Sequence, residues 1–272
     1  MVLPASRLQL TRWLEGFAGA LTSVVFPAGC LLCDALLTHA RRIPLCETCL
    51  ASFQRIAPPI CRICGQTLPV PTEPSESEPV CRDCLEGKFG FQLVRSFGVY
   101  EGALARAIVL LKYQRIEPLG SFFAMRLLEL VRSDPHLLSA DAVVPVPLHR
   151  QKHRDRGYNQ VDLFARPLAR RLHMPYRPIL LMRSRPRPEK HLLSQEERWE
   201  TVRGAFVMRR GDRVDNLRVL LLDDVMTTGA TLDACARALG EAGARSVLGL
   251  TIARAARPAF PVSGAYTLKS AR

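Results

Sequence analysis

The second half of the chain alternates short apolar runs with longer stretches of helical spacing. Apolar runs occur at 143–147, 218–222 and 247–252, and none of them alternates with polar residues, which is typical of strands buried on both faces of a parallel sheet. Helical spacing of apolar residues is found at 103–112, 122–131, 161–172 and 231–242. Strands that alternate with helices predict an α/β fold, in which helices flank a parallel sheet.

The first third of the chain has a different pattern. A helix is predicted by apolar residues that fit one helical face, which are Leu8, Leu10, Leu14, Phe17 and Leu21. The apolar run at 16–26 is shorter than the roughly 20 residues that a membrane span needs, so no span is expected. Long apolar runs are lacking from 29 to 88, where the chain is too short to fold by burial alone. The expected units are an N-terminal helix at 1–28, a small domain at 29–88, the α/β domain at 89–255 and a tail at 256–272.

Cysteine is concentrated in the small expected domain. Eight of the nine cysteines form four C-x-x-C pairs, which are Cys30 and Cys33, Cys46 and Cys49, Cys61 and Cys64, and Cys81 and Cys84. Such pairs are typical of thiolate zinc ligands in a reducing compartment, whereas a small secreted chain would use disulfides. They predict two structural Zn²⁺ ions, each held by two pairs, and a cytoplasmic location. The spacing leaves open whether consecutive or alternate pairs share an ion, and redox dithiols are the alternative.

The chain is also basic. Its 38 Lys and Arg residues against 25 Asp and Glu residues give a formal charge of +13. Eight thiolates and two Zn²⁺ ions would lower this charge to about +9. The balance favours anionic partners such as phosphates, nucleotides or nucleic acids, and it does not choose among them.

The segment 218–232 combines an apolar strand with two acids and a turn of small residues. Asp223 and Asp224 follow the strand, where their carboxylates could accept hydrogen bonds from ribose hydroxyls. The residues that open the next helix are Thr227, Thr228, Gly229, Ala230 and Thr231. A helix N-terminus at the carboxyl edge of a parallel sheet offers free N–H groups to a phosphate, threonine hydroxyls can donate to it, and glycine lets the backbone approach closely. A threonine cap alone would explain one threonine and not the whole string.

The string from Asp223 to Thr231 resembles the phosphoribosyl pyrophosphate (PRPP) loop of type I phosphoribosyltransferases. Together with the cysteine pairs it makes the chain similar to the ComF family, in which a zinc-ribbon region precedes such a domain. Further matching stretches are 111–113, 144–149, 156–160, 193–194, Arg198 and 204–206. The resemblance implies a type I phosphoribosyltransferase-like parallel sheet, PRPP with Mg²⁺ as the ligand, and a link to DNA uptake and to competence proteins.

A second anion site is expected at 144–160, where six basic side chains follow a strand in what we expect to be a loop. Within the family-matching strings, Arg156, Asn159 and Lys112 are the candidate phosphate-binding residues. The chain departs from the family pattern at three positions, where Arg187, Lys190 and Thr201 replace a Thr, a Gln and an Asn. The departure weakens the case for efficient transfer chemistry and leaves the case for phosphate binding unchanged.

Two functions therefore follow from the sequence. One is glycosyl transfer from PRPP, in which a nucleophile displaces pyrophosphate at C1 of the ribose while Asp223 and Asp224 hold the sugar. The other is a non-catalytic module that binds single-stranded DNA or a nucleotide in the same pocket.

Overall fold

Residues 29–37, 42–70, 78–185 and 195–256 are described by the computed structural model. The helix expected at 1–28 and the tail from residue 257 onward lie outside these ranges, as do Arg187 and Lys190. Among the described residues, no helix combines the length and the apolar character that a membrane crossing requires.

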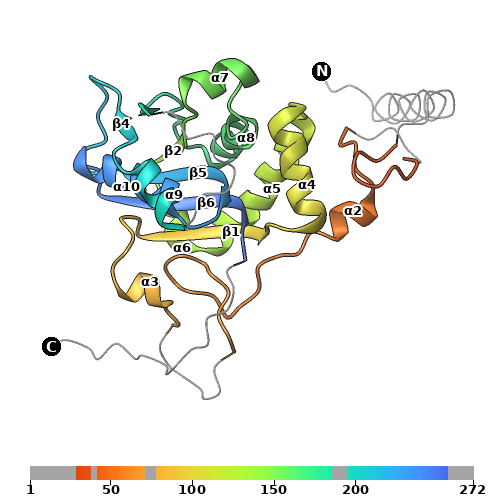
Figure 1. Ribbon diagram of the computed structural model, residues 1–272, viewed down its shortest axis with the longest axis horizontal. Coiled ribbons are helices and arrows are strands. Elements are labelled where there is room, and N and C mark those ends of the chain that lie inside the picture. The colour runs from red at the N-terminus through yellow and green to blue at the C-terminus, as the bar shows by residue number, and fades with distance from the viewer. Residues whose placement is uncertain (1–28, 38–41, 71–77, 186–194, 257–272) are drawn as a thin grey trace, which may run out of the picture.

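A sheet of four parallel strands forms the centre of the molecule, in the order β1, β6, β5, β2 (Figure 1). The strands are β1 (Leu93–Val99), β2 (Ala142–Pro145), β5 (Arg218–Met226) and β6 (Ser246–Arg254). Residues 219–222 of β5 are fully buried because the strand has a neighbour on each side and helices on both faces. The predicted α/β fold is confirmed, and β2, β5 and β6 are the three strands that the apolar runs predict.

Strand β1 was not expected from the sequence because polar side chains interrupt its apolar run. Ser96 Oγ lies 2.6 Å from Thr251 Oγ1 of β6, so the two hydroxyls form a hydrogen bond inside the sheet. Arg95 Nε lies 3.1 Å from Asp134 Oδ2. The side chains of Ser96 and Arg95 thus have partners far away in the sequence, and such pairs cannot be recognised from the hydrophobic pattern around β1.

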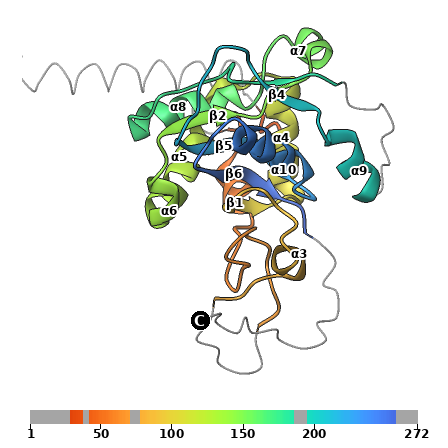
Figure 2. The same cartoon turned by 90° about the vertical axis from the view of Figure 1, so that its left-hand side faces the viewer.

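Helices cover both faces of the sheet (Figure 2). On one face lie α4 (Gly102–Tyr113), α5 (Glu117–Ser133), α6 (Pro135–Leu138) and α8 (Asp162–Leu172), and on the other lies α10 (Ala230–Glu241). Successive residues of β5 point to opposite faces, so Leu220 and Leu222 enter the α5 core while Val219 and Leu221 enter the α10 core. The four helices predicted from apolar spacing are confirmed.

The basic segment after β2 is a helix, so the prediction of a loop was wrong. It forms α7 (Arg150–Arg156), in which no residue is buried. His149 Nδ1 caps the helix by accepting a hydrogen bond from Gln151 N at 3.3 Å. Gly157 ends the helix in the left-handed conformation, with φ of 77°. The basic side chains are therefore presented on an exposed helix at one end of the molecule (Figure 1).

A second, small sheet packs against α10. Strand β3 (Leu181–Arg183) pairs antiparallel with β4 (Phe206–Met208), and α9 (Gln195–Val202) lies between them in sequence. Strands of three residues contain too little hydrophobic pattern to be predicted.

The cysteine-rich segment divides between the two faces of the central sheet. Residues around α2 (Glu47–Ala51) pack with α4 and α5, whereas residues around α3 (Arg82–Leu85) pack in the α10 core. Figure 1 shows α2 beside the foot of α4 and α3 below β1. A segment too small to fold by burial alone is thus supported by the sheet at two separate places.

Candidate functional site

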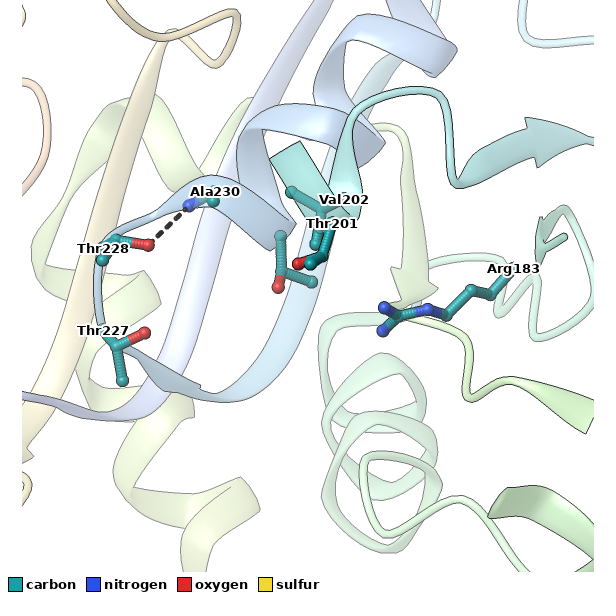
Figure 3. A pocket seen from close by; sticks show the side chains of 7 residues that line it. Arg183, Thr201, Val202, Thr227, Thr228 and Ala230 are labelled. Atoms are coloured by element: carbon teal, nitrogen blue, oxygen red, sulfur yellow. Dashed lines mark hydrogen bonds between the residues drawn. The ribbon is translucent and has the colours of Figure 1, made fainter. Parts of the chain in front are cut away.

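The carboxyl end of β5 leads into α10 through a tight turn, which we call the phosphate turn (residues 227–231). Gly229 is the N-cap of α10 and has φ of 86°, a conformation that only glycine adopts without cost. Thr228 Oγ1 accepts a hydrogen bond from Ala230 N at 3.3 Å (Figure 3). The turn presents the amides of a helix N-terminus at the carboxyl edge of a parallel sheet, which is where such folds bind phosphate.

Glycine at position 229 is also required by packing on the underside of the turn. A Cβ atom there would lie 2.7 Å from Met226 Cε and 2.9 Å from Phe89 Cε1. Phe89 lies in the segment that follows α3, and it stacks on Phe91 with ring centroids 4.6 Å apart. The sequence explains this glycine by the approach of a phosphate, and the structure adds a packed aromatic side chain that the sequence does not show.

The two acids lie within β5 and not after it, because the strand continues to Met226. Successive strand residues face opposite sides of a sheet, so the two carboxylates do not lie side by side. Asp224 is 5% exposed and points toward α4, whereas Asp223 is partly exposed and its Oδ1 accepts a hydrogen bond from Asp224 N at 2.8 Å. The expected pair of equivalent acids is therefore a buried acid and a more accessible one.

Asp224 is the centre of a network that joins three elements. Lys112 Nζ, at the end of α4, lies 3.1 Å from Asp224 Oδ1, and Gln160 Nε2 donates to Asp224 Oδ2 at 2.5 Å. Arg156 Nη1, at the end of α7, donates in turn to Gln160 Oε1, and its guanidinium lies 5.1 Å from the ring centroid of Tyr113. The structure thus brings Lys112 to this acid directly and Arg156 to it through Gln160, although the sequence places the two cations in unrelated segments.

Gln160 was missed as a site residue, although it ends the family-matching string 156–160. Its side chain is 4% exposed. Nothing local in the sequence separates it from an ordinary polar helix-capping residue, because its partners come from α7 and β5.

Asn159 has a structural set of contacts in this structure. Its Nδ2 donates to Val146 O at 3.0 Å, and its Oδ1 accepts from Val161 N at 3.2 Å. Asn159 is 6% exposed. The side chain thereby ties the end of β2 to the beginning of α8, and it shapes the α7 segment.

A pocket opens between the phosphate turn and the small β3–β4 sheet. Arg183 of β3 points its guanidinium into this pocket, opposite the threonines of the turn (Figure 3). Thr201 of α9 lines the same pocket. From the sequence, Thr201 stood out only as a departure from the family pattern, and Arg183 was not singled out. Their place in the pocket depends on the packing of the small β3–β4 sheet and α9 beside α10, which the sequence does not show.

The cysteines form two clusters, each with four sulfur atoms within 4.8 Å of one another. The first cluster is Cys30, Cys33, Cys46 and Cys49, and the second cluster is Cys61, Cys64, Cys81 and Cys84. Consecutive pairs therefore share a site. Four thiolates at about 2.3 Å from a tetrahedral Zn²⁺ lie roughly 3.8 Å apart. The Sγ atoms of Cys33 and Cys46 are 3.6 Å apart, and so are those of Cys64 and Cys81, so both clusters fit a structural zinc ion.

Backbone amides support the sulfur atoms of both clusters. Cys46 N lies 3.3 Å from Cys30 Sγ, and Cys81 N lies 3.3 Å from Cys61 Sγ. Such N–H···S contacts stabilise negative charge on a ligating sulfur. Cys235, the remaining cysteine, is fully buried, and this burial raises the pKa of its thiol well above the ordinary value, so it is a core residue.

Comparison with known proteins agrees with this arrangement. A double zinc ribbon domain matches residues 21–85, and a phosphoribosyl transferase domain matches residues 163–271. DNA utilization protein YhgH of Salmonella typhimurium is 30% identical over 225 residues, which cover 81% of this chain and 94% of that protein. Competence protein ComFC of Bacillus subtilis is 28% identical over 247 residues, which cover 83% of this chain and 94% of that protein.

Among solved structures, the glutamine PRPP amidotransferase from B. subtilis complexed with ADP and GMP is 25% identical, with a TM-score of 0.34, over 48% of this chain and 26% of that chain. This likeness is too distant to bear on function. The two domain matches and the extent of the match to YhgH identify the family. The chain belongs to the ComF/YhgH family and consists of a double zinc ribbon followed by a phosphoribosyltransferase domain.

Proposed function

We propose that the chain binds PRPP or a closely related sugar phosphate at the carboxyl edge of its sheet. The observation that carries the proposal is the network around Asp224, in which Lys112, Gln160 and Arg156 gather at the end of the strand that leads into the phosphate turn. In this arrangement the 5-phosphate would bind the amides and hydroxyls of residues 227–231. The pyrophosphate would lie near the cationic ends of α4 and α7.

The residues present suit a ligand that carries a metal ion as well as phosphates. Asp223 and Asp224 offer carboxylate oxygens, which can coordinate Mg²⁺ and can accept hydrogen bonds from ribose hydroxyls. Mg²⁺ bound with PRPP would neutralise charge that develops on the leaving pyrophosphate. Arg183 faces the phosphate turn across the pocket and would add a cation on the opposite side of the sugar phosphate.

Transfer to an acceptor is the enzymatic part of the proposal. The bond from C1 of the ribose to the pyrophosphate oxygen would break, and a bond from C1 to a nitrogen base or an amine would form. Lys112 and Arg156 would stabilise the departing pyrophosphate, and Asp223 would hold a ribose hydroxyl. A reducing cytoplasm, where thiolates stay available for zinc, suits the chain.

Calorimetry with PRPP and Mg²⁺ tests the binding site. We expect Asp224→Ala to abolish binding, and we expect Asp224→Asn, which keeps the shape and loses the charge beside Lys112, to weaken it strongly. Asp215→Ala is the matched control, since Asp215 is exposed and pairs only with Arg213 on the surface in the contacts seen here. Unchanged binding by Asp224→Ala would refute the site.

A pyrophosphate-release assay tests the transfer step. Purified protein would be incubated with PRPP, Mg²⁺ and a panel of bases and amines. Release that depends on one acceptor and is lost in Asp224→Asn supports a transferase. If PRPP binds and no acceptor gives release, the binding role remains and the transfer step is contradicted.

A nucleic-acid role is the second candidate, and α7 is the observation that favours it. This exposed helix carries five basic side chains, which are Arg150, Lys152, His153, Arg154 and Arg156. Tyr113 lies next to Arg156, is 72% exposed and could stack on a base. Binding of single-stranded DNA should fall steeply with salt and should be competed by PRPP if one pocket serves both ligands.

A further inference from the structure

The second cluster lies close to the phosphate turn, and a single arginine joins it to Met226, the residue just before the turn. Arg254 is the last residue of β6 and is paired in register with Met226 of β5. Its side chain is buried, with only 3% of the residue exposed. Nη1 donates to Cys64 O at 2.7 Å and lies 2.8 Å from Met226 Sδ, while Nη2 lies 3.6 Å from Cys64 Sγ.

A buried guanidinium needs a counter-charge as well as hydrogen-bond acceptors. Four thiolates around Zn²⁺ carry a formal charge of −2, and the contact from Arg254 to Cys64 Sγ places the cation against this charge. The second cluster with Zn²⁺ bound would therefore supply the counter-charge for the buried Arg254.

Arg254 in turn contacts Met226, against which the phosphate turn packs. Met226 is 1% exposed, and its Cε occupies the space that a side chain at Gly229 would need. Its backbone carbonyl accepts a hydrogen bond from Ala255 N at 2.9 Å. The path from Cys64 to Gly229 thus runs through two side chains in contact, Arg254 and Met226.

A second path leads from α3 to the same turn. The residues after α3 cross to α10, where Gly90 N donates to Asp233 Oδ1 at 2.6 Å and Arg237 Nη2 donates to Lys88 O at 3.0 Å. Between them, Phe89 packs against Gly229 from below. The second cluster therefore supports both the start of α10 and the turn that precedes it.

The first cluster is built the same way and supports a different part of the fold. Arg106 of α4 donates from Nη1 to Leu32 O at 2.8 Å, just as Arg254 donates to Cys64 O. Arg106 is exposed, and the first cluster packs on α4 and α5 in the other core. Arg106 thus provides a matched control for Arg254.

We propose that the second cluster, acting through Arg254 and Phe89, holds the phosphate turn in its binding shape, so that this zinc site is needed for sugar-phosphate binding and the first is not. Arg254 is in this view a positioning residue and touches no ligand. The inference rests on the proposed function for the identity of the ligand. The support that the second cluster gives to the turn does not depend on a ligand.

The experiment compares Arg254→Met with Arg106→Met in the full zinc-loaded chain. Zinc content is measured first by mass spectrometry, and amide hydrogen exchange is then followed at residues 226–231. We expect both variants to keep two zinc ions, and we expect Arg254→Met alone to lose about tenfold or more of the protection in the turn. Arg254→Lys, which keeps the charge, should recover part of the protection, which a purely space-filling role would not predict.

Calorimetry with PRPP and Mg²⁺ completes the test. We expect Arg254→Met to bind about tenfold or more weakly and Arg106→Met to bind like the unchanged protein. Wild-type protection and affinity in Arg254→Met would overturn the inference. If the unchanged protein does not bind PRPP while Arg254→Met still loosens the turn, the proposed function fails and the inference on the turn survives.

Phe89→Leu keeps the proposal testable if Arg254→Met does not fold. This substitution removes the ring below Gly229 and leaves every cysteine in place. We expect faster exchange at residues 226–231 with unchanged zinc content. Unchanged exchange in Phe89→Leu would contradict the support from α3.

Discussion

The two cysteine clusters have the same ligands and the same local backbone, but they differ in their surroundings. In each, the residue after the second cysteine donates its N–H to the carbonyl of the first, from Asp34 to Cys30 and from Gly65 to Cys61, both at 2.8 Å. In the first cluster Cys33 is exposed and Cys46 is half-buried. In the second cluster each cysteine is 9% exposed or less. The same local motif thus lies partly at the surface in the first cluster and inside the core in the second.

This contrast shows what a zinc site contributes beyond its own ligands. The first cluster ties the chain to α4 and α5 from outside, whereas the second fills space between β1, β6 and the start of α10. In the second cluster Val94 N, in β1, donates to Ile63 O at 2.6 Å, so the zinc-binding turn adds to the edge of the sheet. Loss of this cluster should therefore destabilise the whole phosphoribosyltransferase domain.

Removal of one ligand from each cluster should give the largest difference. We expect Cys64→Ser to lose one zinc ion and to lower stability by about 4 kcal/mol or more, roughly 10 °C in Tm for a chain of this size. Cys33→Ser should cost less than half as much, because water can reach an exposed position and complete a site with three thiolates. Zinc analysis and thermal unfolding of both variants measure the effect, and equal losses would remove the contrast.

Chelation should separate the two sites in time. We expect a chelator to remove zinc in two phases, and we expect the fast phase to come from the first cluster because two of its four cysteines, Cys33 and Cys46, are accessible to solvent. PRPP affinity should survive the fast phase and disappear with the slow one. Cys33→Ser should accelerate the fast phase, because its site keeps only three thiolates. Loss of PRPP affinity during the fast phase would contradict the inference, because it would show that the first cluster supports the turn.

The sequence predicted the elements that repeat a pattern and missed those that depend on distant partners. Apolar runs without alternation identified β2, β5 and β6, and the cysteine spacing predicted two zinc sites. Strand β1 was missed because its polar residues pair with Thr251 and Asp134, and the helix α7 was taken for a loop because basic residues carry no apolar face. Local patterns report burial and periodicity, and they do not report tertiary contacts.

The candidate site shows the same limit. The string from Asp223 to Thr231 was visible because all its residues are consecutive, and the structure does bring Lys112 and Arg156 beside it. Gln160, Arg183 and Arg254 were not singled out as site residues, because each acts through a partner at least 64 residues away or through a neighbouring sheet. A contact of this kind becomes visible only when the sheet order is known.

The residue after the second cysteine has a left-handed conformation in both zinc-binding turns, and substitutions there should have smaller effects on stability. Gly65 has φ of 68°, and a Cβ there would lie 2.7 Å from Val94 O. We expect Gly65→Ala to cost about 2–4 kcal/mol, because the left-handed conformation costs about 1–2 kcal/mol for alanine and the backbone of β1 must also move. Urea unfolding measures the cost, and a loss below about 1 kcal/mol would show that β1 yields easily.

Asp34 occupies the corresponding position in the first cluster, with φ of 59°. A substitution there should have the smallest effect on stability of those proposed. Aspartate tolerates this conformation better than alanine does, and the first cluster lies at the surface, so nothing there demands glycine. We expect Asp34→Gly to change stability by no more than about 0.5 kcal/mol, because relief of backbone strain is offset by the greater freedom of glycine in the unfolded chain. A stabilisation above about 1 kcal/mol would mean that the first turn is strained, and the two turns would then differ in backbone energy as well as in what surrounds them.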